Sequence, residues 1–130
     1  MTVIKKLNDL DITLSKLSRK KILSLVPTMG SLHKGHISLI KSALKYSDEV
    51  WVSIFVNPTQ FNDINDYKKY PVNYKQDINI IKSINQNINI FLPSIDDIYG
   101  KKIIRDKFSF DGIDKVLEGI KRPGHFDGVA

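Results

Sequence analysis

The amino-acid sequence predicts an α/β fold, built on a parallel sheet with helices on both faces. Short β-branched and aromatic runs alternate with segments whose apolar residues recur every three or four positions. Strands and helices alternating at this spacing indicate βαβ units, whose right-handed crossovers place helices on both sides of a sheet. The chain stops on Gly-Val-Ala without a capped helix. We therefore expect residues 1–130 to be one N-terminal domain, incomplete at its C-terminal end, with the C-terminal domain of a longer protein absent.

The first half of the chain supplies two helices and two strands. Apolar residues at helical spacing predict an amphipathic helix over residues 3–19. The apolar run of residues 22–26, which Pro27 ends, predicts a buried parallel strand. Residues 35–46 carry their apolar side chains on one face and predict a second helix. The β-branched and aromatic run of residues 50–56 predicts a second buried strand.

The second half repeats the pattern more weakly. Residues 62–70 are polar and typical of a turn. An isoleucine stripe predicts a helix over residues 77–84, and the apolar run of residues 88–92 predicts a third strand that ends before Pro93. From residue 101 onward the periodicity fades. The candidate strand positions in that part are Phe108 and Phe110.

The composition excludes several classes of protein. No apolar run approaches the roughly 18 residues that a membrane-spanning helix needs. The first residues lack the apolar core of a secretory signal, and the absence of cysteine excludes disulfides and thiolate metal sites. We therefore expect a cytoplasmic protein that has no membrane partner.

The net charge of +6 would permit binding to nucleic acid. However, the 20 basic residues are spread along the chain, whereas phosphate recognition needs a clustered patch. The one dense basic cluster, residues 19–21, suits the end of a helix, where cations are favourable. We therefore expect no nucleic-acid partner, and we keep a basic RNA-binding module as an alternative that salt-sensitive binding would reveal.

The connection between the first buried strand and the next helix carries the most informative residues. Gly30 and Gly35 allow close backbone approach, and the N–H groups of the first helical turn can donate to phosphate oxygens. His33 and His36 lie three positions apart and share one face of a helical turn. This arrangement suits adenylyl transfer, which must bind a triphosphate and offset charge developing at phosphorus. An alternative interpretation, a pair of surface histidines that only caps the helix, remains open. A metal site is not favoured, because no third and fourth ligand stands nearby.

A second polar loop follows the second strand. Asn57 and Gln60 interrupt an apolar strand end, between Phe55 and Phe61. Amide side chains both donate and accept, which suits a hydroxy acid held in an apolar pocket, although Asn-Pro also begins ordinary turns. Because ligands of parallel sheets bind beyond the carboxyl ends of the strands, we expect both loops at one edge of the sheet.

A third segment, residues 122–129, contains a cation, a histidine, an aspartate and two glycines. Its spacing alone assigns it no role. Together, the three segments resemble the pantothenate synthetase (pantoate–β-alanine ligase) family. That family has Val-Pro-Thr-Met-Gly-x-Leu-His-x-Gly-His, then Val-Ser-Ile-Phe-Val-Asn-Pro-x-Gln-Phe, then Arg-Pro-Gly-His-Phe-x-Gly-Val. Here the three motifs stand in the same order, at residues 26–36, 52–61 and 122–129.

The resemblance implies a Rossmann-like nucleotidyltransferase domain that binds ATP with Mg²⁺. Such an enzyme forms pantoyl adenylate from pantoate, transfers the pantoyl group to β-alanine, and is a homodimer. By motif, His36 would be the proton donor, Asn57 and Gln60 would bind pantoate, and Gln60 would also bind β-alanine. No protein metal ligand is implied. The ATP-binding residues would be Met29, Gly30, Ser31, Leu32, His33, Lys34, Gly35 and His36.

Two features separate this chain from the family pattern. Val72 stands where the family usually has arginine, which removes any ion pair made there. The family's Gly-Glu-Lys-Asp and Ser-Ser-Arg segments are also absent, so we expect the 130-residue chain alone to lack ligase activity. Another nucleotidyltransferase with the His-x-Gly-His loop is the second alternative, but it gives no reason for Asn-Pro-x-Gln-Phe.

Overall fold

The computed structural model describes residues 1–100. The chain divides into two compact units. Unit 1 comprises residues 1–55 and 71–98, and unit 2 comprises residues 56–70 and the chain from Tyr99 onward. The candidate strand positions Phe108 and Phe110 lie outside the described residues. Within residues 1–100, no helix is long and apolar enough to span a membrane.

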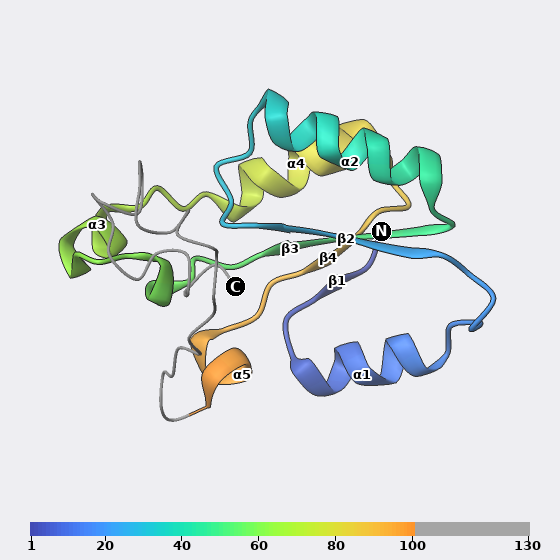
Figure 1. Cartoon of the computed structure of the whole chain (residues 1–130), viewed down its shortest axis with the longest axis horizontal. Helices are drawn as coiled ribbons and strands as arrows, with labels where there is room; N and C mark the ends of the chain where they lie inside the picture. Colours follow the sequence, from blue (N-terminus) through green and yellow to red (C-terminus); the bar gives the residue numbers. More distant parts are fainter. Residues whose placement is uncertain (101–130) are drawn as a thin grey trace, which may run out of the picture. The chain divides into compact units, whose positions relative to one another are not determined.

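Unit 1 is organised around a four-stranded parallel sheet with the strand order β1-β4-β3-β2. The strands are β1 (Val3–Ile4), β2 (Leu23–Thr28), β3 (Glu49–Ile54) and β4 (Asn89–Phe91). Figure 1 shows α2 (Lys34–Tyr46) and α4 (Tyr74–Ile84) on one face of the sheet and α1 (Leu7–Ser15) on the other. This arrangement confirms the predicted α/β fold with helices on both faces.

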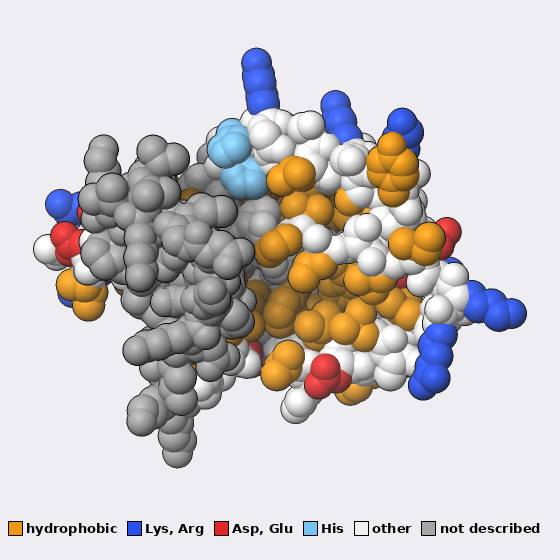
Figure 2. Space-filling view, viewed as in Figure 1, with side chains coloured by type: hydrophobic (Ala, Val, Ile, Leu, Met, Phe, Trp, Pro, Cys, Tyr) orange, Lys and Arg blue, Asp and Glu red, His pale blue; other side chains and the backbone are white. Residues whose placement is uncertain are grey.

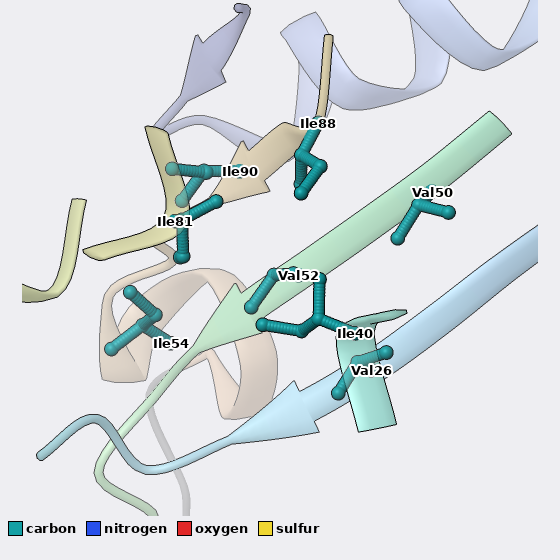
Figure 3. Close-up of a cluster of buried hydrophobic side chains, with 8 residues drawn as sticks. All are labelled: Val26, Ile40, Val50, Val52, Ile54, Ile81, Ile88 and Ile90. Atoms are coloured by element: carbon teal, nitrogen blue, oxygen red, sulfur yellow. The ribbon is translucent and has the colours of Figure 1, made fainter. Parts of the chain in front are cut away.

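The main core lies between the sheet and helices α2 and α4. Alternate residues of β3 point into it, so Val50, Val52 and Ile54 are buried on this face while Trp51 is buried on the other. Ile40 of α2 and Ile81 of α4 are fully buried against them (Figure 3). Trp51 packs in a second cluster on the α1 side. That cluster also contains Ile4 and Phe91, with Leu10 and Leu14 packed against it.

Five of the predicted elements are confirmed with shifted ends: α2, α4, β2, β3 and β4. The single helix predicted over residues 3–19 is wrong at its start. Val3 and Ile4 form β1 instead, and the amide of Leu92 donates to the carbonyl of Ile4 at 2.8 Å. The apolar side chains of Val3 and Ile4 fit either a helix or a strand in the sequence pattern. Because both residues are β-branched and pair with β4, they form a strand.

The segment predicted as a polar turn, residues 62–70, is also different. It contains α3 (Ile64–Lys69), which begins after Asp63, whose carboxylate accepts the amide of Asn65 at 2.8 Å. This N-cap satisfies a helical donor that has no partner within the helix. Two further short helices were not predicted: η1 (Pro58–Gln60) and α5 (Ile95–Tyr99).

Strand β2 is parallel, as predicted, but it is buried on one face only. Val26 is buried, whereas Leu23 and Leu25 on the other face are 41% and 58% exposed. Helix α1 packs over β1, β3 and β4 through the Trp51 cluster, which among the described residues contains none from β2. Figure 2 shows the resulting hydrophobic surface. Among the described strands β2 is at the sheet edge, where Pro27, which lacks an N–H group, fits within the strand.

Candidate active site

The carboxyl ends of β2 and β3 lie level in the sheet, because Thr28 is paired with Ile54. The chain leaves β2 in a turn at residues 30–32, which we call the 30–32 turn. Its first residue is held by Thr28, whose hydroxyl accepts the amide of Gly30 at 3.1 Å and donates to the carbonyl of Ser53 at 3.0 Å. The turn is thereby tied to both strands, at the edge of a parallel sheet where ligands bind.

The 30–32 turn has two consecutive residues in the left-handed region, Gly30 with φ 78° and Ser31 with φ 52°. Asp77 of α4, which is only 3% exposed, accepts from this turn with both carboxylate oxygens. Oδ2 accepts the amide of Ser31 and Oδ1 accepts the amide of Leu32, each at 3.0 Å. A Cβ atom at Gly30 would lie 2.9 Å from Oδ2 of Asp77, so both the φ angle and this contact require glycine.

The two histidines form a reciprocal cap at the start of α2. His33 is the N-cap residue, and its Nδ1 accepts the amide of Gly35 at 3.0 Å. Nδ1 of His36 accepts the amide of His33 at 3.2 Å, and the two ring centroids are 4.0 Å apart. An accepting Nδ1 carries no proton, so we assign the neutral tautomer with the proton on Nε2 to both rings. The arrangement therefore presents two Nε2–H donors from one helical turn.

Burial lowers the pKa of His36 below the ordinary histidine value of 6.5, and the neighbouring His33 lowers it further. Asp77 acts in the opposite direction and raises the pKa. The neutral form of His36, with its proton on Nε2, therefore predominates at pH 7. A neutral Nε2–H suits contact with a phosphate oxygen whose charge grows during reaction.

We expect an NMR titration of His36 to have its midpoint below 6.5. The folded chain then binds this proton less tightly than the unfolded chain. The contribution of His36 to stability is therefore complete above pH 6.5 and is lost as the pH falls through the lowered pKa. The variant His33→Gln removes the imidazole of His33, which lowers the pKa of His36, and should therefore raise the His36 midpoint. A midpoint at or above 6.5 in the parent chain would contradict the described environment.

Unit 2 contains the second polar loop. The side-chain oxygen of Asn57 accepts the amide of Thr59 at 3.0 Å, the hydroxyl of Thr59 at 2.7 Å and the hydroxyl of Tyr99 at 2.7 Å. Asn57 is thus the N-cap of η1, and Gln60 is the last residue of that turn and is half-buried. The Asn57 oxygen orders the backbone that carries Gln60.

Removing the Tyr99 hydroxyl tests this organisation. Tyr99→Phe loses the hydrogen bonds to Asn57 and Thr59, and we expect it to destabilise unit 2 by about 1–2 kcal/mol. Urea denaturation followed by circular dichroism measures this loss. Tyr46→Phe is the matched control, because Tyr46 is 67% exposed and its loss of a hydroxyl should leave the curve unchanged. Equal curves for the two variants would show that the Tyr99 contacts contribute no stability.

The structure brings His33, His36 and the 30–32 turn together in unit 1, and Asn57 and Gln60 together in unit 2. The third motif, residues 122–129, lies outside the described residues. Sequence reasoning missed Asp77. Its signal was its position four residues before Ile81, which puts a carboxylate on the apolar face of α4. Within the described part of the chain, no group of three or more His, Cys, Asp or Glu could hold a metal ion.

A family model described as Pantoate-beta-alanine ligase matches residues 2–130. The chain belongs to this family. A pantothenate synthetase of Christiangramia forsetii is 50% identical over 109 residues, which are 84% of this chain and 38% of that protein. A pantothenate synthetase of Phocaeicola vulgatus is 45% identical over 99% of this chain and 45% of its own length. The chain therefore spans less than half the length of these pantothenate synthetases.

Solved structures of the ligase family have the same fold. The pantoate-beta-alanine ligase of Francisella tularensis, complexed with beta-gamma ATP and beta-alanine, superposes with a TM-score of 0.91 at 44% identity. That match covers 98% of this chain and 49% of the other. The pantothenate synthetase of Thermus thermophilus has a TM-score of 0.85 at 31% identity, over 99% of this chain and 45% of the other. The parallel α/β architecture is thus that of the pantoate–β-alanine ligases.

Proposed function

We propose that this chain is the nucleotide-binding portion of a pantoate–β-alanine ligase that forms pantothenate at the expense of ATP. The observation that carries the proposal is the histidine pair, which presents two Nε2–H donors at the start of α2. Membership of the family and the ATP and β-alanine complex of the Francisella relative support it.

The proposed reaction has two steps. A carboxylate oxygen of pantoate attacks the α-phosphorus of ATP, the bond to the β-phosphate oxygen breaks, and pyrophosphate leaves. The amine of β-alanine then attacks the acyl carbon of pantoyl adenylate, the carbon–oxygen bond breaks, AMP leaves, and the ammonium proton passes to solvent. Activation as an acyl phosphate supplies the leaving group that a carboxylate lacks, and a closed pocket protects it from water.

The ATP site that we propose comprises residues 29–36. Several of its amides already have partners: those of Gly30, Ser31, Leu32, His33 and Gly35. The imidazoles of His33 and His36, with the charge of Lys34, are therefore the groups that we assign to the phosphates. His36 acts through its Nε2 proton as the donor to the leaving oxygen or its phosphate.

We assign pantoate and β-alanine to Gln60, and pantoate also to the amide of Asn57. Support comes from the family motif at residues 57–60 and from the hydrogen bonds by which Asn57 orders the turn that ends at Gln60. The described residues offer no set of protein metal ligands, so in this proposal Mg²⁺ arrives bound to the ATP phosphates and neutralises their charge. A homodimer and a cytoplasmic location complete the proposal.

We further propose that the 130-residue chain has no ligase activity by itself, because it covers only 38–45% of the two pantothenate synthetases compared above. The decisive experiment joins residues 1–130 to the remaining C-terminal part of the Francisella relative. We expect this joined protein to form AMP only when ATP, pantoate and β-alanine are all present. The 130-residue chain alone is the control and should form none. AMP formation by the chain alone, at the rate of the joined protein, would refute the proposed inactivity.

The acceptor of the adenylyl group distinguishes the proposed ligase from another nucleotidyltransferase. Pyrophosphate release from the joined protein should depend on pantoate and should not be supported by phosphate-containing acceptors. Release that ignores pantoate would favour the alternative, and RNA binding that weakens steeply with salt would favour a basic RNA-binding module.

A further inference from the structure

The interior of unit 1 contains one buried carboxylate that the proposed reaction does not use, that of Asp77. It lies in the first turn of α4, and Ile78 and Ile81 of the same helix pack into the main core. Figure 1 shows α4 beside α2, on the same face of the sheet. The position of Asp77 is therefore fixed by the core rather than by the surface.

The Asp77 carboxylate lies against the backbone of the 30–32 turn. Successive amides of a turn converge on an anion, as they do in phosphate-binding loops. Here the anion belongs to the protein: Ser31 and Leu32 each donate to a different oxygen of Asp77 at 3.0 Å. The contact joins residues 46 positions apart in the chain. Because Asp77 is buried, water does not compete with the two amides for its carboxylate oxygens.

The histidine pair begins directly after this turn. His36 accepts the backbone amide of His33, and His33 accepts that of Gly35, so the direction of both rings follows the backbone of residues 33–36. That backbone starts at Leu32, one of the two residues that Asp77 holds. A hydrogen bond from the Ser31 hydroxyl to the carbonyl of Pro71, at 2.9 Å, anchors the outer side of the turn.

We propose that Asp77 is a positioning residue for the histidine pair. Its carboxylate holds the 30–32 turn in its left-handed conformation, and the turn in turn sets the direction in which His33 and His36 present their Nε2–H groups. Asp77 itself does not contact the nucleotide. The effect of Asp77 on the reaction with ATP rests on the proposed function, whereas its effect on the 30–32 turn and on the histidine rings does not.

The variant Asp77→Asn tests the proposal on the 130-residue chain. An amide has the same size but accepts at one position only, so one of the two turn amides loses its acceptor. We expect hydrogen exchange of the amide that loses its acceptor, either that of Ser31 or that of Leu32, to accelerate about 10- to 100-fold, the worth of one hydrogen bond to a charged group. We also expect the ¹⁵N shifts of His33 and His36, which report an Nε2–H tautomer in the parent chain, to move toward a tautomer mixture.

Ile81→Val is the matched control, because it destabilises the same helix through the core and leaves the Asp77 contacts in place. Its histidine ¹⁵N shifts should equal those of the parent chain. Unchanged shifts and exchange in Asp77→Asn, or the same shift changes in Ile81→Val, would overturn the proposal. If Asp77→Asn does not fold, the parent chain decides: the Ser31 and Leu32 amides should exchange as slowly as that of Val52, and exchange at the rate of an exposed loop overturns the proposal.

The joined protein extends the test to the reaction. There, Asp77→Asn should lower kcat/KM for ATP about 10- to 100-fold and leave KM for β-alanine unchanged, since the loss acts through the histidines. An unchanged kcat/KM for ATP, alongside altered histidine shifts, would overturn the link to the nucleotide. If the unsubstituted joined protein has no ATP-dependent activity, the proposed function fails, and the NMR measurements alone decide the role of Asp77.

Discussion

Replacing His36 by asparagine is expected to lower pantoate-dependent pyrophosphate release by about 10²- to 10³-fold, the usual cost of removing one preorganised donor to developing charge. The choice of asparagine follows from the cap. Its side-chain oxygen can replace Nδ1 as the acceptor for the amide of His33, so the start of α2 should survive. What the variant removes is the Nε2–H group, which asparagine is too short to replace. The measurement is made on the joined protein under saturating pantoate.

The two kinetic constants separate the possible roles of this donor. A donor that contacts the phosphates equally before and during reaction affects KM for ATP, whereas one that strengthens with the developing charge affects kcat. We expect most of the loss in kcat, because a neutral imidazole interacts weakly with the ground state and more strongly as charge grows. His33→Asn, which preserves the N-cap in the same way, is the companion variant. An unchanged kcat in His36→Asn would remove His36 from the chemistry.

The fold of unit 1 could be predicted largely from local patterns. Strand β3 has a run of β-branched and aromatic residues, and helix α2 has an apolar stripe at helical spacing. Such signals depend only on neighbours in the sequence. Strand β1 has two residues, and pairing with β4 decides its conformation, so no local pattern could indicate it. The exposure of Leu25 could not be predicted either, because it depends on how far α1 extends across the sheet.

The candidate site, too, could be predicted from the sequence only in part. The motif around His33 and His36 predicts a place for phosphates from residue types and spacing alone. Which ring nitrogen faces the backbone could not be predicted, and this detail decides what the rings present to a ligand. The phosphate contacts expected from the amides of the first helical turn stay a prediction. The contact of Asp77 with the amides of Ser31 and Leu32 could not be predicted, because Asp77 lies 46 positions away from Ser31 and only the folded core brings them together.

The largest expected effect on stability comes from Gly30→Ala. Alanine at a φ of 78° costs about 1–2 kcal/mol for the left-handed conformation alone. The added Cβ would also lie 2.9 Å from the Asp77 carboxylate and 3.2 Å from Ile54 in the core, and neither neighbour can withdraw without loss. Overpacking of this kind adds about 1–3 kcal/mol, so we expect a total of about 2–5 kcal/mol in urea denaturation.

Gly100→Ala separates the two contributions. Gly100 has a φ of 67°, close to that of Gly30, but a Cβ there meets nothing within 4 Å. Its alanine variant should therefore cost only the conformational term, about 1–2 kcal/mol. The difference between the variants then measures how firmly Asp77 and Ile54 enclose the turn. Equal losses would mean that the turn can move away from Asp77, and that the carboxylate does not hold the backbone from which the histidine pair begins.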